Sequence, residues 1–508
     1  MGSAVAAGCA LGLGAPPGLS AFAQSATDGR DLPVVEHVLE NGMRFLLLPR
    51  PGAPTIAFVT HIGVGSVHDP AGATGTSHIL EHLLFKGTTT IGTRDLGAEL
   101  GLFTVMDAAQ DSLALLGDRR SGAAADDAAR LESRIRALED SARVFTVPGE
   151  FDEILTRSGA RGLNATTGYE ATEYTVSLPA NRAKLWFVLE ADRMRNAVFR
   201  EFYAERSVVA EERRTRVESS PGAMLFEAHL REAFRTHPYG VLPIGRMEEI
   251  ESLTRPGVRE HFQRYYGPGN TTVAIVGAFE PDSAIAWAED YFGPLPPGDA
   301  APASSAVEPP QTEGRTLEVA LDAEPVLRVS WKVPGAAHPD APALAMLANV
   351  LVGSRDARLY RRLVREDRSA RSVVAAAEPG GRDPGLFTIQ ADPLSPFTPE
   401  AMLTVIVEEL DRLRREPPGS DELERVRARL EAASVRRLTS NEGLALQLVA
   451  SQALWGDWRE TFGLQERMRA VGPDDIVGVL DRYFRDDGRT VGILRRAGAP
   501  NPPEPRSP

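Results

Sequence analysis

Two histidines and a glutamate stand close together in the segment Gly75-Thr76-Ser77-His78-Ile79-Leu80-Glu81-His82-Leu83. Residues four apart lie one above the other on a helix, so His78 and His82 can bind one metal ion if the segment is helical. Glu81 stays near the same face and can reach a water molecule beside the metal. Two neutral imidazoles and a carboxylate suit Zn²⁺, which in catalytic sites takes three protein ligands and one open position. The spacing therefore predicts a zinc site whose third ligand comes from elsewhere in the chain.

The residues around this pattern are apolar, which predicts a largely buried helix: Ile79, Leu80, Leu83, Leu84 and Phe85. Buried histidines and glutamates need polar partners, and a shared metal ion supplies one. The segment from His78 to His82 alone leaves one alternative open, a hydrogen-bonded cluster without metal.

The longer segment from Gly75 to Thr88 has the form Gly-x-x-His-Ile-Leu-Glu-His-x-x-Phe-Lys-Gly-Thr. It closely resembles the active-site helix of the M16 peptidases, the family of pitrilysin, insulinase and the mitochondrial processing peptidase. The order His-x-x-Glu-His is that of the inverted zincins. That family takes its third ligand from a downstream helix, and residues 205–212, Glu-Arg-Ser-Val-Val-Ala-Glu-Glu, match it. The resemblance implies that Glu212 is the ligand, that Glu205 supports it, and that Glu211 faces solvent.

The composition excludes several classes of function. The chain has 508 residues, with 56 Lys and Arg against 70 Asp and Glu, and its net charge is −14. Because there is also no basic run, nucleic acid is not expected as the main partner. Cys9 is the only cysteine, so neither a disulfide framework nor a thiol nucleophile is expected in the body of the protein. Beyond the N-terminus no stretch approaches the roughly 18 apolar residues of a membrane helix, so no integral membrane segment is expected.

Residues 1–30 are predicted to be a signal peptide or a disordered N-terminus. Residues 4–15 are small and apolar, and Ala21-Phe22-Ala23 resembles a signal cleavage site, although no Lys or Arg precedes the apolar stretch. The signal peptide would place the mature protein in the periplasm or outside the cell. Residues 499–508 are rich in proline and are predicted to be a disordered tail.

Residues 162–167 and 172–178 alternate in polarity, which predicts a β-hairpin. The first strand resembles the Asn-Ala-x-Thr edge strand along which M16 peptidases bind their peptide substrate. An unpaired strand edge binds an extended peptide through its backbone groups. Asn164 and Ala165 are therefore candidate substrate-binding residues, and a purely turn-stabilising Asn164 is the alternative.

An internal repeat divides the chain. Residues 264–266 and 272–275, Arg-Tyr-Tyr and Thr-Val-Ala-Ile, recur as Arg-Tyr-Phe and Thr-Val-Gly-Ile at 482–484 and 490–493. Each copy predicts a helix, a short turn and a terminal strand. We expect an α+β protein with two homologous M16-type (LuxS/MPP-like) α/β-sandwich domains, each with an antiparallel-rich sheet packed against helices. The expected order is a catalytic domain at 31–280 with a helical insert at about 103–150, a Pro/Ala-rich linker at 281–314, and a domain without metal at 315–498.

The resemblance implies a zinc-dependent metalloendopeptidase, with one Zn²⁺ per chain, that hydrolyses short or unfolded peptides with Glu81 as the base. Mn²⁺ or Co²⁺ could occupy the same ligands in vitro. Two alternatives are a non-catalytic M16-like scaffold or assembly subunit, and a metal-dependent hydrolase acting on other substrates. The family also uses an Arg/Tyr pair from a later domain, and the corresponding stretch 385–390 contains neither residue. A second M16-like subunit, in a homodimer or heterodimer, is therefore expected to supply the pair.

Overall fold

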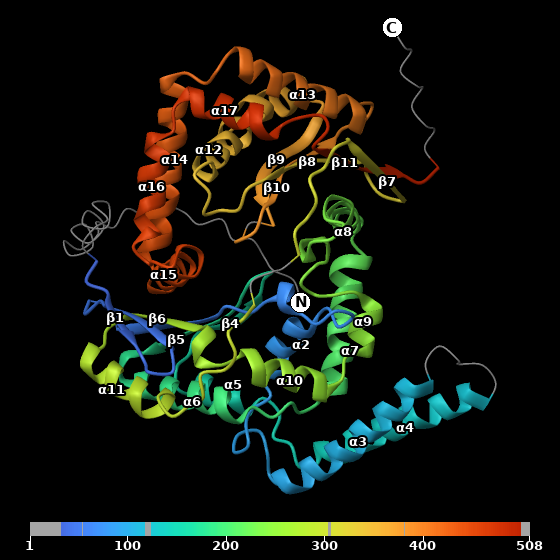
Figure 1. Ribbon diagram of the computed structural model, residues 1–508, viewed down its shortest axis with the longest axis vertical. Helices are drawn as coiled ribbons and strands as arrows, with labels where there is room; N and C mark the ends of the chain where they lie inside the picture. The colour runs from blue at the N-terminus through green and yellow to red at the C-terminus, as the bar shows by residue number, and fades with distance from the viewer. Residues whose placement is uncertain (1–31, 53, 117–122, 303–305, 380, 499–508) are drawn as a thin grey trace.

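Two β-sheets form the framework of the protein, one in each half of the chain (Figure 1). The computed structural model describes residues 32–52, 54–116, 123–302, 306–379 and 381–498, so the predicted signal peptide and the proline-rich tail lie outside it. The first sheet has the strand order β1-β2-β6-β3-β5-β4 and contains β1 (Val35–Val38), β2 (Arg44–Pro49), β3 (Thr55–Ile62), β4 (Arg161–Thr167), β5 (Thr172–Pro179) and β6 (Thr271–Gly277). The second has the order β7-β11-β8-β10-β9 and contains β7 (Arg315–Leu321), β8 (Val326–Val333), β9 (Ala370–Glu378), β10 (Gly385–Pro393) and β11 (Arg489–Arg496).

The second sheet repeats the topology of the first without its β1. In each sheet one pair of strands is parallel, β2 with β6 and β7 with β11, and the other pairs are antiparallel. The Thr-Val-Ala-Ile and Thr-Val-Gly-Ile parts of the repeat lie in β6 and β11, the last strands of their sheets in chain order. The mixed α+β fold with two related sheets is thus confirmed.

The central strands are apolar along almost their whole length because both faces of the first sheet are covered. In β3, seven of the eight residues are buried, including Phe58, which pairs with Val176 on one side and Ile275 on the other. The edge strand β4 instead alternates between exposed and half-buried residues.

Helices of the first half pack around one face of the first sheet and around its end. They are α2 (Thr76–Leu83), α3 (Leu96–Leu116), α4 (Ala123–Arg143), α5 (Glu150–Arg157), α6 (Ala183–Asn196), α7 (Phe202–Arg213), α8 (Pro221–Ala233), α9 (Met247–Ser252), α10 (Arg255–Tyr265) and α11 (Pro281–Phe292). Helices α3 and α4 form an antiparallel hairpin that projects from the body (Figure 1). The hairpin begins at Leu96, earlier than the insert expected at about residue 103.

The helices of the second half pack on the second sheet, on one another or on the first sheet. They are α12 (Ala341–Val352), α13 (Pro399–Arg415), α14 (Ser420–Thr439), α15 (Asn441–Trp455), α16 (Glu460–Ala470) and α17 (Pro473–Tyr483). One core joins the sheet to α12, α13, α14 and α17 through residues such as Leu347, Phe387 and Ile406.

Each half also lends one helix to the sheet of the other. Helix α15 of the second half packs on β3 and β6, where Leu448 and Val449 contact a core that contains Val59 and Val276. Helix α8 of the first half packs on β7, β8 and β11, and the Nε2 atom of its fully buried His229 lies 2.6 Å from Ser330 Oγ. This reciprocal packing, which Figure 1 shows, holds the two halves together.

The linker expected at 281–314 is wrong at its start, because residues 281–292 form helix α11. Phe292 is fully buried and packs against Phe45 with ring centroids 5.7 Å apart. The helix therefore belongs to the core of the first half.

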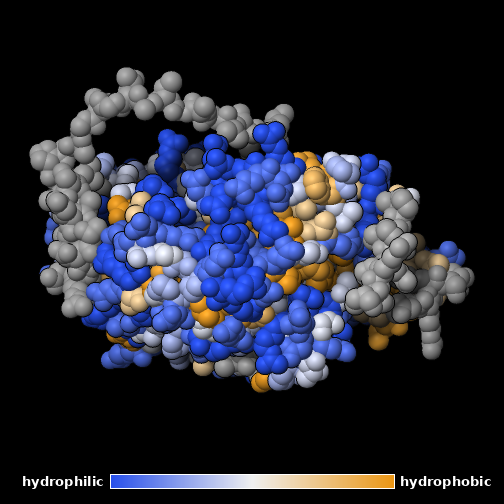
Figure 2. Space-filling model, turned by 90° about the horizontal axis from the view of Figure 1, so that it is seen from above, coloured by the Kyte–Doolittle hydropathy of each residue, from blue (hydrophilic) through white to orange (hydrophobic). Residues whose placement is uncertain are grey.

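The face seen in Figure 2 is mostly hydrophilic, with hydrophobic residues in small groups. Among the described residues, no helix is both long enough and apolar enough to cross a lipid bilayer.

Candidate metal centre

Helix α2 begins at a glycine that no other residue could replace without strain. Gly75 has φ 91°, and a Cβ atom there would lie 2.7 Å from the carbonyl oxygen of Ile244. Asp69 then satisfies the first turn, because its carboxylate accepts hydrogen bonds from the backbone N–H groups of Gly75 and Ser77, both at 2.8 Å, and from the Ser77 hydroxyl at 2.7 Å. These contacts fix the direction in which the helix presents its histidines.

The structure brings His78, His82 and Glu212 together. Their candidate ligand atoms all lie within 4.8 Å of one another. His78 Nε2 is 3.9 Å from Glu212 Oε1, and His82 Nε2 is 3.5 Å from Glu212 Oε2. Both Nε2 atoms therefore face the carboxylate, and the two rings are tilted by 75° with centroids 5.0 Å apart. Neighbouring Glu211 is exposed and pairs with Arg214 instead.

Glu205 contacts His82 from the other side of its ring. Its Oε2 atom lies 3.3 Å from His82 Nδ1. Its Oε1 atom forms an ion pair with Lys86 Nζ at 2.6 Å, and Lys86 also pairs with Glu201. A carboxylate at Nδ1 keeps a proton on that nitrogen, so Nε2, on the Glu212 side of the ring, is the nitrogen available to a metal ion.

Glu81 turns toward strand β4 rather than toward Glu212. The Thr167 hydroxyl donates a 2.6 Å hydrogen bond to Glu81 Oε2. Burial raises the pKa of Glu81, and the hydrogen bond from Thr167 acts in the opposite direction. This carboxylate sits beside the cluster without being part of it.

Arg216 approaches Glu212 from solvent. It lies in a π-helical turn, residues 214–218, that continues α7, and its Nη1 atom is 2.6 Å from Glu212 Oε1. Such turns inside helices often occur at functional sites. Glu212 is thus held among two imidazoles and one guanidinium.

The two histidines have opposite protonation preferences. Burial, and next the neighbouring His82, lowers the pKa of His78 to about 4, so His78 is neutral at pH 7. Burial alone would also lower the pKa of His82, but contacts with Glu205 and Glu212 raise it to about 9. Burial raises the pKa of Glu205, but the contacts with His82 and Lys86 outweigh burial, so the pKa is lowered overall.

The donor set fits a zinc ion. It offers two imidazole nitrogens and a carboxylate oxygen, facing one point from helices α2 and α7. A cation bound there would replace the proton that His82 otherwise holds between two carboxylates, so binding should release protons. The carboxylate at His82 Nδ1 is the outer partner that metal-bound histidines commonly have.

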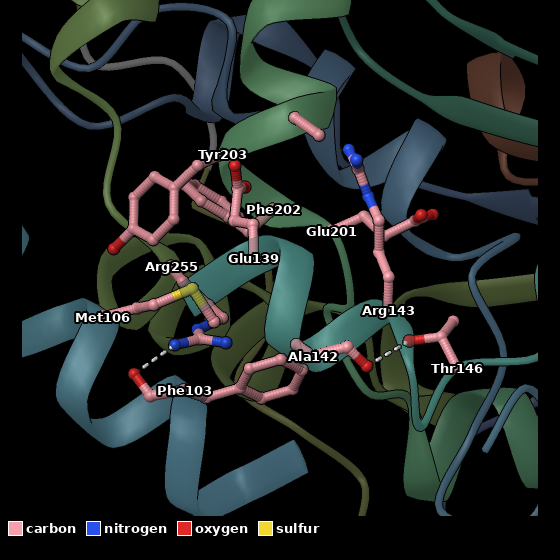
Figure 3. A pocket seen from close by; sticks show the side chains of 11 residues that line it. Phe103, Met106, Glu139, Ala142, Arg143, Thr146, Glu201, Phe202, Tyr203 and Arg255 are labelled. Atoms are coloured by element: carbon pink, nitrogen blue, oxygen red, sulfur yellow. Dashed lines mark hydrogen bonds between the residues drawn. The ribbon is translucent and has the colours of Figure 1, made fainter. Parts of the chain in front are cut away.

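The helical hairpin supports the start of α7, the helix that carries Glu205 and Glu212. Figure 3 shows Arg255 of α10 donating to the carbonyl oxygen of Phe103 in α3, at 2.6 Å. Tyr203 of α7 donates to Asp107 of the hairpin at 3.0 Å. Deeper in, a fully buried ion pair joins Glu99 of the hairpin to Arg200 at 2.9 Å. The hairpin base is therefore rigidly attached beside the candidate metal centre.

The candidate substrate residues lie on the edge strand. Asn164 of β4 is exposed and stands opposite Thr175 of β5, whereas Ala165 is half-buried against the core around α2. Strand β4 pairs with β5 only, among the described strands.

The sequence did not point to Lys86, Thr167, Arg216 or Asp69, although all four contact the site. For Arg216 the signal was available, because i and i+4 spacing from Glu212 favours an ion pair on a helix. The partners of Thr167 and Lys86 are 86 and 119 residues away in the chain, so only the folded structure shows them.

Two family models match the chain. The model described as Insulinase (Peptidase family M16) matches residues 44–103, which include the His-x-x-Glu-His segment. The model described as Peptidase M16 inactive domain matches residues 252–430. Glu205 and Glu212 fall between the two matched regions.

Proteins named zinc proteases are similar over nearly the full length. The chain is 26% identical over 472 residues to zinc protease PqqE of Helicobacter pylori, covering 91% of this chain and 93% of that protein. It is 23% identical over 457 residues to the uncharacterized zinc protease YmxG of Bacillus subtilis, covering 89% and 96%.

Solved structures share the fold. The crystal structure of a protease from Helicobacter pylori has a TM-score of 0.76 at 24% identity and covers 92% of this chain and 100% of that chain. The periplasmic protease PqqL from Escherichia coli has a TM-score of 0.68 at 17% identity and covers 92% of this chain and 48% of that one.

Proposed function

Because the chain belongs to peptidase family M16, we propose that it is a zinc-dependent endopeptidase that hydrolyses short or unfolded peptides. The observation that carries the proposal is the convergence of His78, His82 and Glu212, with Glu81 beside them. The names of the similar zinc proteases support the same reaction class.

In the proposed mechanism His78, His82 and Glu212 hold one Zn²⁺ ion. When bound, Zn²⁺ polarises the carbonyl group of a peptide bond and lowers the pKa of a water molecule toward neutrality. Glu81 accepts the proton of the attacking water and later delivers it to the departing amine. Its partly buried position raises its pKa, which favours this exchange of a proton. Glu205 holds the His82 ring in the tautomer that leaves Nε2 free.

The substrate is proposed to lie along strand β4, with Asn164 and Ala165 in contact with it. Since β4 pairs with β5 alone among the described strands, an extended peptide can add to the sheet at its other edge through main-chain hydrogen bonds. Backbone recognition depends little on the side chains of the peptide, so it suits short and unfolded substrates. It also favours peptides over other hydrolysable substrates.

The proposal includes a location and a partner. The Escherichia coli protein of the same fold is called periplasmic, which supports an exported protein here. A second M16-like subunit would supply the Arg/Tyr pair. Cell fractionation tests the location, and size-exclusion chromatography of the active preparation tests the subunit.

The central experiment compares the wild type with Glu81→Gln in a quenched-peptide cleavage assay, with zinc measured in the same samples. We expect one Zn²⁺ per chain in both proteins and a loss of at least about 100-fold in kcat for Glu81→Gln, because only the base is removed. Glu211→Gln is the matched control, since Glu211 is exposed and pairs with Arg214 at 3.2 Å. A wild-type protein that binds no zinc and cleaves no peptide would instead support the non-catalytic scaffold.

A further inference from the structure

Thr167 contacts the carboxylate that we propose as the base, yet it is neither a metal ligand nor one of the candidate substrate residues. It is the last residue of β4, and its hydroxyl donates to Glu81 Oε2 at 2.6 Å. The bond is short and partly buried, and it joins helix α2 to the edge strand across 86 positions of the chain. A charge-assisted bond of this kind restrains the orientation of a carboxylate.

The surroundings of Thr167 are held in place from two sides. The turn that follows it is closed by a hydrogen bond from Gly168 N–H to the carbonyl oxygen of Ala171 at 2.8 Å. The segment that precedes α2 is hydrogen-bonded to the same turn. Ser66 N–H donates to the carbonyl oxygen of Gly168 at 3.1 Å, and Val67 N–H donates to the carbonyl oxygen of Tyr169 at 2.9 Å.

That close approach requires a glycine. A Cβ atom at Gly65 would lie 2.6 Å from both the Gly168 carbonyl oxygen and the Ala171 nitrogen, which is closer than any side chain can come. In addition, the buried Thr172 hydroxyl donates to the carbonyl oxygen of Val64 at 3.0 Å. The turn after β4 and the segment leading into α2 therefore form one rigid unit, and Thr167 cannot move away from Glu81 independently.

We infer that Thr167 is a positioning residue that ties the base to the strand on which the peptide is proposed to lie. The inference rests on the proposed function and adds to it the register of the substrate. Asn164 and Thr167 are three residues apart, or about 10 Å along an extended strand. A peptide paired with β4 from Asn164 onward thus reaches Glu81 after about three residues, and the bond to be cleaved lies at the Thr167 end of the strand.

A purely structural role is the competing explanation, because Thr167 also pairs with Thr172 in the hairpin. The two roles predict different results for a matched control. Thr175 lies in the same hairpin and its hydroxyl donates to the carbonyl oxygen of Gly162 at 3.2 Å, without contact to Glu81. Thr175→Val therefore removes one threonine hydrogen bond from the hairpin and leaves the base untouched.

The experiment measures kcat, KM and zinc content for Thr167→Val, Thr167→Ser and Thr175→Val. For Thr167→Val we expect a loss of about 10- to 100-fold in kcat, with KM changed less than twofold and one Zn²⁺ per chain retained. Thr167→Ser keeps the hydroxyl and should recover kcat to within about threefold of the wild type. Thr175→Val should keep the wild-type kcat.

A double variant tests whether Thr167 acts through Glu81. Thr167→Val combined with Glu81→Gln should be no slower than Glu81→Gln alone, because the position of the base no longer matters once the base is absent. Wild-type kcat in Thr167→Val, no recovery with serine, an equal loss in Thr175→Val, or additive losses in the double variant would each overturn the inference while leaving the endopeptidase proposal standing. A wild type that shows no zinc-dependent cleavage would overturn the proposed function and this inference with it.

Discussion

Replacing Glu205 by glutamine should weaken zinc binding without touching a metal ligand. Glu205 lies 3.3 Å from His82 Nδ1 and its side chain is 13% exposed, so the contact is shielded from solvent. The substitution keeps the shape of the side chain and removes its negative charge. Lys86 would keep its positive charge through its 3.2 Å pair with Glu201, and that charge then opposes a cation at His82.

The magnitude follows from the protonation of His82. Contacts with Glu205 and Glu212 outweigh burial and raise its pKa from 6.5 to about 9, which corresponds to about 3 kcal/mol in favour of positive charge on the ring. If the two carboxylates contribute equally, Glu205 accounts for at least about 1.5 kcal/mol, because burial acts against both. Its loss should therefore lower the affinity for Zn²⁺ about tenfold, at the lower end of what outer partners of metal ligands contribute.

The assay is a competition titration against a chromophoric zinc chelator at constant pH and ionic strength. Glu211→Gln serves as the control, because it removes the same charge from an exposed position on the same helix. Thermal unfolding of the metal-depleted proteins checks that both variants fold. An affinity for Glu205→Gln within twofold of the wild type would refute the assignment of Glu205 as the partner that stabilises His82.

Two further predictions concern stability. Burial, with Arg328 nearby, lowers the pKa of His229 to about 3. Below pH 6.5 the unfolded chain therefore binds a proton that the folded protein does not, and the free energy of unfolding decreases as the pH decreases. Urea unfolding should show a loss of about 2 kcal/mol from this group between pH 7.5 and 5, and His229→Gln should remove that part of the dependence. Leu448→Ala should lower the free energy of unfolding by about 2–5 kcal/mol, because Leu448 of α15 is fully buried against the first sheet. The control Leu115→Ala, at an 89% exposed position, should change it by less than about 0.5 kcal/mol in the same thermal or urea unfolding experiment.

Local patterns in the sequence predict the elements of this fold well. The Asn41-Gly42 pair predicts the turn between β1 and β2, and Gly42 indeed has φ 90°. In the second half, the apolar stretch at 326–333 predicts a strand and the Ala/Leu-rich stretch at 341–352 predicts a helix, and these are the bounds of β8 and α12. These features depend on residues close in the chain, which is why they can be recognised without the structure.

Features that depend on distant contacts were not predicted. The composition of residues 281–314 predicts a linker because prolines dominate its later part, although Pro281 in the first turn of α11 favours a helix start. The apolar residues of helices such as α8 and α15 indicate burial but not which sheet the helix covers. The positions of Asp69, Lys86 and Thr167 around the candidate metal centre depend on the tertiary arrangement in the same way.

The exchange of α8 and α15 has a consequence for how the chain can be divided. In an oligomer, two subunits that each lend a helix to the other form an isologous, domain-swapped interface. Here that interface lies within one polypeptide, with a related sheet on either side of it. All three proposed metal ligands come from the first half, yet that half alone would expose the apolar face of β3 and β6 that α15 covers. We therefore expect the two halves to fold as one unit, and the first half to be unstable when it is separated from the second.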